Sequence, residues 1–111
     1  MAPRKREVRW SDGAAEDPWE ILEYIARDRP SVARDILQDI RNRSESLRFA
    51  AEKGRIVPEL ERQGIGEYRE LVISVWRLIY KITHRAIEVL LVVDSRRNVE
   101  DILLMRLSRR K

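Results

Sequence analysis

The stretch YRELVISVWRLIYKITHRAIEVLLVV, residues 68–93, decides the fold that the sequence predicts. It holds three runs rich in β-branched and aromatic residues, at 68–73, 76–83 and 87–93, with two and then three residues between them. Because connectors this short join strands that run in opposite directions, we expect an antiparallel meander. The third run is almost continuously apolar, which is typical of a central strand covered on both faces.

A helix is expected ahead of this meander. Asp17 precedes Pro18, and Glu20 follows three residues after Asp17, a pattern that predicts a helix capped by Asp17 with Pro18 in its first position. A start at Ser11 or Asp12 would place Pro18 inside the helix, where proline removes a hydrogen bond and disrupts the turn. We therefore place the start at Asp17.

A second helix is expected to follow Pro30, and the tight turn before it makes the two helices an antiparallel hairpin. Gly54 is a natural end for the second helix. Trp19 in the first helix is interpreted as a core residue. The apolar and small residues of the second helix recur every three or four positions and form one stripe that we expect to be buried: Ala33, Ile36, Leu37, Ile40, Ser44, Leu47 and Ala51.

The two ends of the chain add a strand and a helix. Residues 7–10 alternate polar and apolar as a half-buried strand does, and residues 99–107 resume helical spacing. The predicted fold class is α+β, with an N-terminal strand, an antiparallel helical hairpin packed on a mainly antiparallel sheet, and a short C-terminal helix. We expect one domain over residues 1–111, with the basic ends 1–6 and 108–111 flexible.

The composition excludes several classes of protein. Of the 111 residues, 43% are hydrophobic and 38% are charged, which is enough apolar material for a core and too much charge for a membrane protein. The absence of cysteine excludes a disulfide scaffold, a thiolate metal site and cysteine catalysis. Met1–Arg6 is basic without an apolar signal core after it, and no run approaches the roughly eighteen apolar residues of a membrane span. We expect a cytoplasmic protein with no membrane contact, no metal and no cofactor.

The net charge of +4 is unevenly placed along the chain. Residues 13–50 are slightly acidic, and the segments before and after them are basic. Such an excess suits a polyanionic partner, because cationic side chains release counterions from a polyphosphate. It is equally compatible with arginine and glutamate alternating on solvated helix faces.

Five short segments occur in an order and spacing that carry a family resemblance. They are Ala14-Ala15-Glu16-Asp17 ahead of Ile21 and Tyr24-Ile25, Gly54-Arg55-Ile56-Val57-Pro58-Glu59-Leu60, Tyr68-Arg69-Glu70-Leu71, Trp76-Arg77-Leu78-Ile79-Tyr80, and Arg96-Arg97. Together they make the chain, over roughly residues 7–107, similar to the RelE/ParE family of bacterial toxins. Pro18 departs from the pattern, since relatives often carry an aliphatic residue there.

The resemblance implies the toxin of a type II toxin–antitoxin system. Such a toxin inhibits growth and is held inactive, in a hetero-oligomer, by a cognate antitoxin encoded beside it, whose flexible segment wraps the toxin. RelE-like members enter the ribosomal A site and cleave mRNA there. ParE-like members share the fold and inhibit DNA gyrase.

A few positions decide whether such a chain can cleave RNA. Attack by a 2′-hydroxyl needs a proton acceptor, a proton donor and cations facing the phosphate. By resemblance, Arg77 matches the phosphate-stabilising arginine of the nuclease members, Arg69 a second basic position, and Arg96 or Arg97 a third. The same four arginines are the candidate target-binding residues. Arg77 also has a structural interpretation, because an arginine in a strand beside Trp76 must reach water, a carboxylate or a phosphate.

Two positions depart from the nuclease pattern. Leu71 shares a strand face with Arg69, where a nuclease would carry a second cation, so we expect that face to attract phosphate only through Arg69 and Arg77. The C-terminal tyrosine of the nucleases would fall near Ile102 or Leu103, which are core-facing helix positions. The residues left as candidates for proton transfer are Tyr68, Tyr80, His84, Glu70 and Glu88.

Most of these candidates have a structural interpretation as well. Tyr80 shares a strand face with apolar neighbours, which favours packing in the core over catalysis. His84 lies in a short turn, where a histidine is mostly solvated. Arg69 can pair across the sheet with Glu70 or Glu88 in a surface contact.

Three functions remain in competition. The sequence favours a ParE-like binding toxin with DNA gyrase as its target. The alternative is a RelE-like ribosome-dependent mRNA endonuclease, in which the ribosome positions the substrate and the arginines stabilise the transition state. A basic nucleic-acid-binding module ranks third, because the aromatic residues lie in apolar stripes and not among basic residues on an open face.

Overall fold

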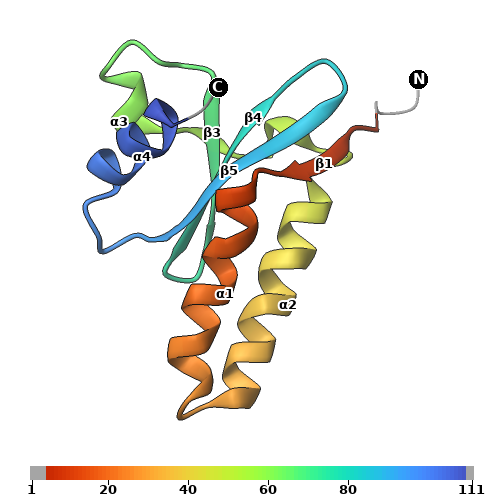
Figure 1. Ribbon diagram of the computed structural model, residues 1–111. Coiled ribbons are helices and arrows are strands. Elements are labelled where there is room, and N and C mark those ends of the chain that lie inside the picture. The colour runs from red at the N-terminus through yellow and green to blue at the C-terminus, as the bar shows by residue number, and fades with distance from the viewer. Residues whose placement is uncertain (1–4, 110–111) are drawn as a thin grey trace.

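Figure 1 shows the computed structural model, which describes residues 5–109 as a five-stranded sheet with helices on both faces. The expected flexible ends fall largely on residues 1–4 and 110–111, which lie outside the described residues. No helix within 5–109 is both long and apolar enough to cross a membrane. In chain order the elements are β1 (Glu7–Trp10), α1 (Asp12–Ala26), α2 (Pro30–Ser46), a short 3-10 helix (Ala51–Lys53), β2 (Arg55–Ile56), α3 (Pro58–Glu61), β3 (Tyr68–Ile73), β4 (Trp76–Ile82), β5 (Ala86–Asp94) and α4 (Val99–Ser108).

The sheet has the strand order β1-β5-β4-β3-β2, in which β1 runs parallel to β5 and every other pair is antiparallel. This confirms the predicted α+β fold, with its N-terminal strand, helical hairpin, meander and short C-terminal helix. Strand β5 lies between β1 and β4, and every residue from Ala86 to Val93 except Glu88 is buried. The continuous apolar run therefore marked a central strand, as predicted.

Each face of the sheet carries its own core. Side chains that alternate along β4 separate into the two cores: Leu78 and Tyr80 pack on the side of α1 and α2, whereas Ile79 packs on the side of α3 and α4. The register between β4 and β5 shifts at Ile79 and Tyr80, and this β-bulge turns both Leu90 and Leu91 toward α3 and α4.

Helix α1 begins six residues earlier than the sequence predicts. Its cap is Ser11, whose Oγ accepts a hydrogen bond from the Ala14 N–H at 3.1 Å, and Pro18 lies inside the helix. The prediction that Asp17 caps the helix is therefore wrong. Pro18 removes one backbone hydrogen bond from the helix. Because α1 follows β1 after a single residue and packs on the sheet from its start, tertiary packing outweighs the loss of that hydrogen bond.

The early start also shifts the buried face of α1. Ala14 and Leu22 face the core, whereas Trp19 is 58% exposed, so the prediction of Trp19 as a core residue is wrong. On α2 the predicted stripe is buried most deeply at Ile40 and in the residue after the helix, Leu47, which are 1% and 0% exposed. In Figure 1 the turn of the α1–α2 hairpin extends past the sheet, so side chains near that turn have less of the sheet to pack against.

The edge of β5 beyond Leu90 has no neighbouring strand within residues 5–109, because β1 pairs only with residues 86–89. Asp17 and Arg106 occupy the position of the missing strand. The Asp17 carboxylate accepts the Val92 N–H at 2.9 Å, and the Arg106 guanidinium donates to the Leu90 carbonyl at 3.0 Å. The two side chains also form a two-point ion pair at 3.0 and 3.1 Å, so α1 and α4 are joined across the edge.

Replacing Ile40 by alanine should lower the free energy of unfolding by about 2 to 5 kcal/mol, because the side chain is 1% exposed at the centre of the hairpin core. Urea denaturation measures this change. Val32→Ala on the same helix is the matched control, since Val32 is 40% exposed and should change the stability by less than about 0.5 kcal/mol. Equal effects of the two changes would contradict the packing of α2.

Replacing Asp17 by alanine should expose the amide of Val92 and leave Arg106 without its carboxylate. We expect a loss of about 1 to 3 kcal/mol and faster hydrogen exchange at the Val92 amide than at amides paired within the meander. Glu23→Ala, at an exposed position of the same helix, is the control and should leave that amide protected. Unchanged exchange at Val92 in the Asp17 variant would contradict this account of the edge.

Candidate functional site

Arg77, the strongest sequence candidate, is buried. It lies on β4 and faces the α3–α4 side of the sheet, and the residue is 6% exposed. Its Nη1 and Nη2 donate to the two carboxylate oxygens of Glu59 at 2.6 and 2.7 Å, and its Nε donates to Glu70 at 2.6 Å. Of the three partners that the sequence left open for Arg77, which were water, a carboxylate and a phosphate, the structure selects a carboxylate.

The pair extends into a short chain of alternating charges. Glu70 is 1% exposed and also accepts from Arg55 on β2 at 2.5 Å, so Arg77 and Arg55 flank one buried carboxylate. The hydrogen bonds from Arg77 lower the pKa of Glu59 from 4.5 to about 2. The same contact with Glu59 raises the pKa of Arg77, so Glu59 and Arg77 both stay charged at neutral pH. The positive charge of Arg77 is therefore balanced from within the chain.

Arg69 lies on the opposite face of the sheet from Arg77. It pairs with Tyr80 in the β3–β4 register, whereas Arg77 pairs with Val72, and alternation places these two pairs on different faces. The expectation of one phosphate-attracting face bearing both arginines is therefore wrong. Arg69 donates to the carbonyl of Gly54 at 2.8 Å, and it binds neither of the carboxylates that the sequence suggested for it.

Tyr80 is buried in the hairpin core, as the structural interpretation predicted. Its hydroxyl donates to the carbonyl of Ala51 at 2.7 Å and accepts the N–H of Gly54 at 2.9 Å. Burial raises the pKa of the Tyr80 hydroxyl, which keeps it protonated. A Cβ at Gly54 would lie 2.5 Å from both the Tyr80 hydroxyl and the Glu70 carbonyl, so the close approach requires glycine. Tyr80 thus fastens the 3-10 helix to the sheet.

The two arginines that follow β5 differ in their surroundings. Arg96 is exposed and pairs with Asp94 at 2.6 Å. That hydrogen bond lowers the pKa of Asp94 to about 2. Arg97 makes no ion pair within residues 5–109 and lines a hollow between α1, β5 and α4. Arg97 is therefore the member of the pair that is available to a partner.

The remaining sequence candidates are spread over the sheet. Leu71 is 4% exposed on the hairpin side, which confirms that it shares a face with Arg69. Leu103 is fully buried and Ile102 packs against the same core, so the C-terminal helix offers apolar side chains where the nucleases keep a tyrosine. The structure does not bring the other candidates together at one place: Tyr68 is buried on β3, Glu88 is half-buried on β5, and His84 is exposed in the turn.

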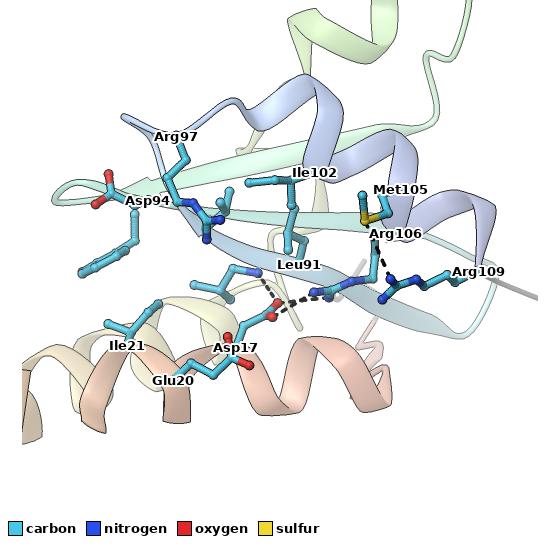
Figure 2. Close-up of a pocket in the computed structure, with 13 residues that line it drawn as sticks. Asp17, Glu20, Ile21, Leu91, Asp94, Arg97, Ile102, Met105, Arg106 and Arg109 are labelled. Atoms are coloured by element: carbon cyan, nitrogen blue, oxygen red, sulfur yellow. Dashed lines mark hydrogen bonds and ion pairs between the residues drawn. The ribbon is translucent and has the colours of Figure 1, made fainter. Parts of the chain in front are cut away.

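A hollow beside Arg97 has a volume of about 420 Å³ (Figure 2). One wall is α1, the other is α4, and the floor is the free edge of β5. Figure 2 shows Asp17 and Arg106 pointing toward each other across it. Sequence reasoning missed this site, because Asp17 had been interpreted as a helix cap and nothing local connects it to a residue near the C-terminus.

The chemistry of these surfaces favours binding over catalysis. Within residues 5–109 no three histidine or acidic side chains are placed to hold a metal ion. Of the candidates for proton transfer, Glu70 contacts Arg77, but it does so as one of the two carboxylates that bind the guanidinium, and it is 1% exposed. The arrangement can hold a partner through apolar contacts and ion pairs in the α1–α4 hollow.

Comparison with known proteins gives one family and one similar fold. A family model described as "ParE toxin of type II toxin-antitoxin system, parDE" matches residues 8–99. A solved structure described as "Chromosomal ParDE TA system from P. aeruginosa" has a TM-score of 0.67 and 19% sequence identity, over 81% of this chain and 96% of that chain. At that identity the likeness concerns the fold alone. No curated protein matches the chain.

Replacing Arg77 by alanine should lower the free energy of unfolding by about 3 to 5 kcal/mol, because it leaves the buried carboxylate of Glu70 without this partner. Thermal or urea unfolding measures the loss. Arg96→Ala is the control, because its ion pair is exposed and should contribute little to stability. Equal stability of the two variants would show that Arg77 is not part of the core.

The stability that Glu59 contributes should depend on pH. Its pKa is about 2 in the folded protein, below its ordinary value of 4.5, so the contribution is complete above about pH 5 and is lost as the pH falls toward 2. Glu59→Gln should therefore be less stable than the parent at pH 7, and the difference should shrink as the pH falls from 5 to 2. A difference that stays constant over that range would contradict the ion pair with Arg77.

Proposed function

We propose that this chain, which belongs to the ParE family of toxins from type II toxin–antitoxin systems, arrests bacterial growth by binding DNA gyrase and is neutralised by a cognate antitoxin. Family membership rests on the match over residues 8–99. Gyrase as the target, cytoplasmic action and neutralisation by an antitoxin are what the family resemblance implies. The structure bears on the choice between binding and cleavage.

The state of Arg77 is the observation that favours binding. A nuclease of this superfamily needs a cation facing the scissile phosphate as negative charge builds on it. Arg77 occupies the matching position, but Glu59 and Glu70 bind its guanidinium from within the chain. A phosphate would have to displace carboxylates that are 17% and 0% exposed, and would meet their negative charge. These contacts favour a structural role for Arg77 over phosphate binding.

The alternative, a ribosome-dependent mRNA endonuclease, has little support from the other candidates. Arg69 faces the hairpin side and binds the carbonyl of Gly54, and Tyr80 is buried with both hydrogen-bonding directions of its hydroxyl in use. Leu71 and Leu103 are buried apolar residues at positions that a nuclease would use for charge or proton transfer. A ribosome-bound substrate would find no evident general acid among these residues.

An antitoxin is expected from the family and suits the surface. Trp19, Tyr24, Phe49 and Met105 are each more than half exposed, which is costly for a protein that functions alone. A partner that binds the folded toxin also stabilises it by mass action. We therefore expect the chain to express poorly alone and well when co-expressed with the small protein encoded beside it.

Induced expression of the chain should stop DNA replication before translation, and the purified protein should inhibit DNA supercoiling by gyrase. Incorporation of labelled thymidine and of labelled methionine separates the two processes in cells, and mRNA from the same cells should show no cuts phased to codons. Co-expression of the adjacent small protein is the control and should restore replication. Codon-phased cleavage of mRNA by the folded chain would overturn the gyrase proposal and favour the endonuclease.

A further inference from the structure

A hollow separate from that of Figure 2 runs between the two helices of the hairpin, which lie side by side in Figure 1. It has a volume of about 430 Å³, and no residue of β2 to β5 lines it, so it opens on the side of the hairpin that faces away from the meander. We call it the α1–α2 groove. It is lined by Trp10, Pro18 and Trp19 on the α1 side and by the stretch from Leu37 to Glu45 on the α2 side.

The inside of the groove is apolar. Pro18 and Ile40 are buried in it, and Leu37 is half-buried. Trp19 lies at the rim and is 58% exposed, so a large aromatic side chain is presented to solvent beside an apolar interior. Tryptophan is among the residues that contribute most to protein interfaces, because it removes a large apolar area from water. The groove is therefore suited to contact with another protein surface.

The α1 rim of the groove is acidic. Glu16 and Glu23 are three residues before and four residues after Trp19, so helical spacing places both on the same face of α1 as the tryptophan. Both are exposed, and neither makes an ion pair within residues 5–109. The charge of this rim is thus not balanced by the described part of the chain.

The α2 rim is basic. Arg34 and Arg41 are seven residues apart and share a face of α2, and both are exposed without an ion pair in the described residues. Glu45 lies on the same rim, but it is already bound by Arg48 of this chain. Asp35 and Asp39 are one and two residues from the two arginines, spacings that place them on a different face.

We propose that the α1–α2 groove binds a second copy of this chain, about a two-fold axis that runs along the groove. This axis places α1 of each copy over α2 of the other, so each acidic rim faces a basic rim and each Trp19 meets the apolar inside of the opposite groove. An axis across the groove would instead bring like charges together. The inference goes beyond the proposed function and depends neither on the target nor on the antitoxin.

The positions of the charges along the hairpin agree with this symmetry, which brings together residues at equal distances from the turn. Glu23 lies four residues before the turn at 27–29, and Arg34 lies five residues after it. Glu16 and Arg41 are eleven and twelve residues from the same turn. Because both helices rise by the same amount per residue, each glutamate lies level with one arginine of the opposite copy.

The divided charge also argues against other occupants. A nucleic acid would gain the basic rim but would meet Glu16 and Glu23 on the other. A partner surface of a single charge would be repelled by one of the two rims. A second copy satisfies both rims with the same residues.

The test is the dissociation constant of the dimer of the purified full chain, measured by sedimentation equilibrium. Reversing the basic rim, by Arg34→Glu with Arg41→Glu, or the acidic rim, by Glu16→Arg with Glu23→Arg, should raise Kd at least about tenfold. An equal mixture of the two reversed chains should restore a dimer, because every facing pair of rims is again of opposite charge. Thermal unfolding of each variant establishes that it is folded.

Matched controls separate the groove from general effects of charge and size. Asp35→Arg with Asp39→Arg makes the same change in net charge as reversal of the acidic rim, but off the groove, and should leave Kd within about threefold. Trp19→Ala should weaken the dimer at least about tenfold, whereas Tyr24→Ala, which removes an aromatic residue that is 78% exposed on the same helix and outside the groove, should not.

Each other outcome would overturn the proposal. A parent chain that stays monomeric up to about 100 µM has no such interface. A dimer that is unaffected by Trp19→Ala and by both rim reversals uses another surface. Failure of the two reversed chains to pair with each other, when each is folded, would show that the rims do not face one another. Loss of the dimer in each reversed chain and its return in the mixture supports the two-fold contact.

Discussion

Strand β5 is longer than its neighbour β1, and the backbone that extends past β1 must find hydrogen-bond partners. This single requirement fixes much of the structure. Asp17 can reach the Val92 N–H only if α1 begins directly after β1, which places Pro18 inside the helix. Arg106 can reach the Leu90 carbonyl only if α4 folds back over the sheet. Gly13 leaves room for that arginine, since a Cβ there would lie 2.9 Å from its Nη1. Residues of α1, near the start of the chain, and of α4, near its end, therefore meet over the unpaired edge of β5.

The other end of the sheet is closed by similar means. Strand β2 pairs only with Arg69 and Glu70 of β3, and the Val72 carbonyl farther along accepts a hydrogen bond from Arg43 of α2 at 3.3 Å. Side chains therefore cover backbone groups that an open sheet edge would offer to another strand. A partner has fewer opportunities to add a strand and more to bind between helices, where the apolar and charged side chains of α1 and α4 remain accessible.

The sequence predicted the elements whose determinants are local. Alternation and short connectors located the meander, the N-terminal strand and the C-terminal helix to within one residue of their ends. Its failures involve contacts between different elements. Asp17 resembled a cap because its partner Arg106 is 89 residues away. Arg69 and Arg77 were assigned to one face because alternation within a strand does not give the register between strands, which pairs Arg69 with Tyr80.

Arg77 shows why a matching residue is not a matching site. Its place in β4 corresponds to the phosphate-stabilising arginine of the nuclease relatives, yet its chemistry depends on Glu59 and Glu70, which approach from α3 and β3. Two carboxylates around one guanidinium supply the negative charge that a phosphate would otherwise bring, and burial makes their removal costly. A site of this kind stabilises the fold and is closed to substrate. Binding surfaces are then better sought where charges are not balanced internally, and of the arginines suggested by the sequence Arg97 is exposed and makes no ion pair within residues 5–109.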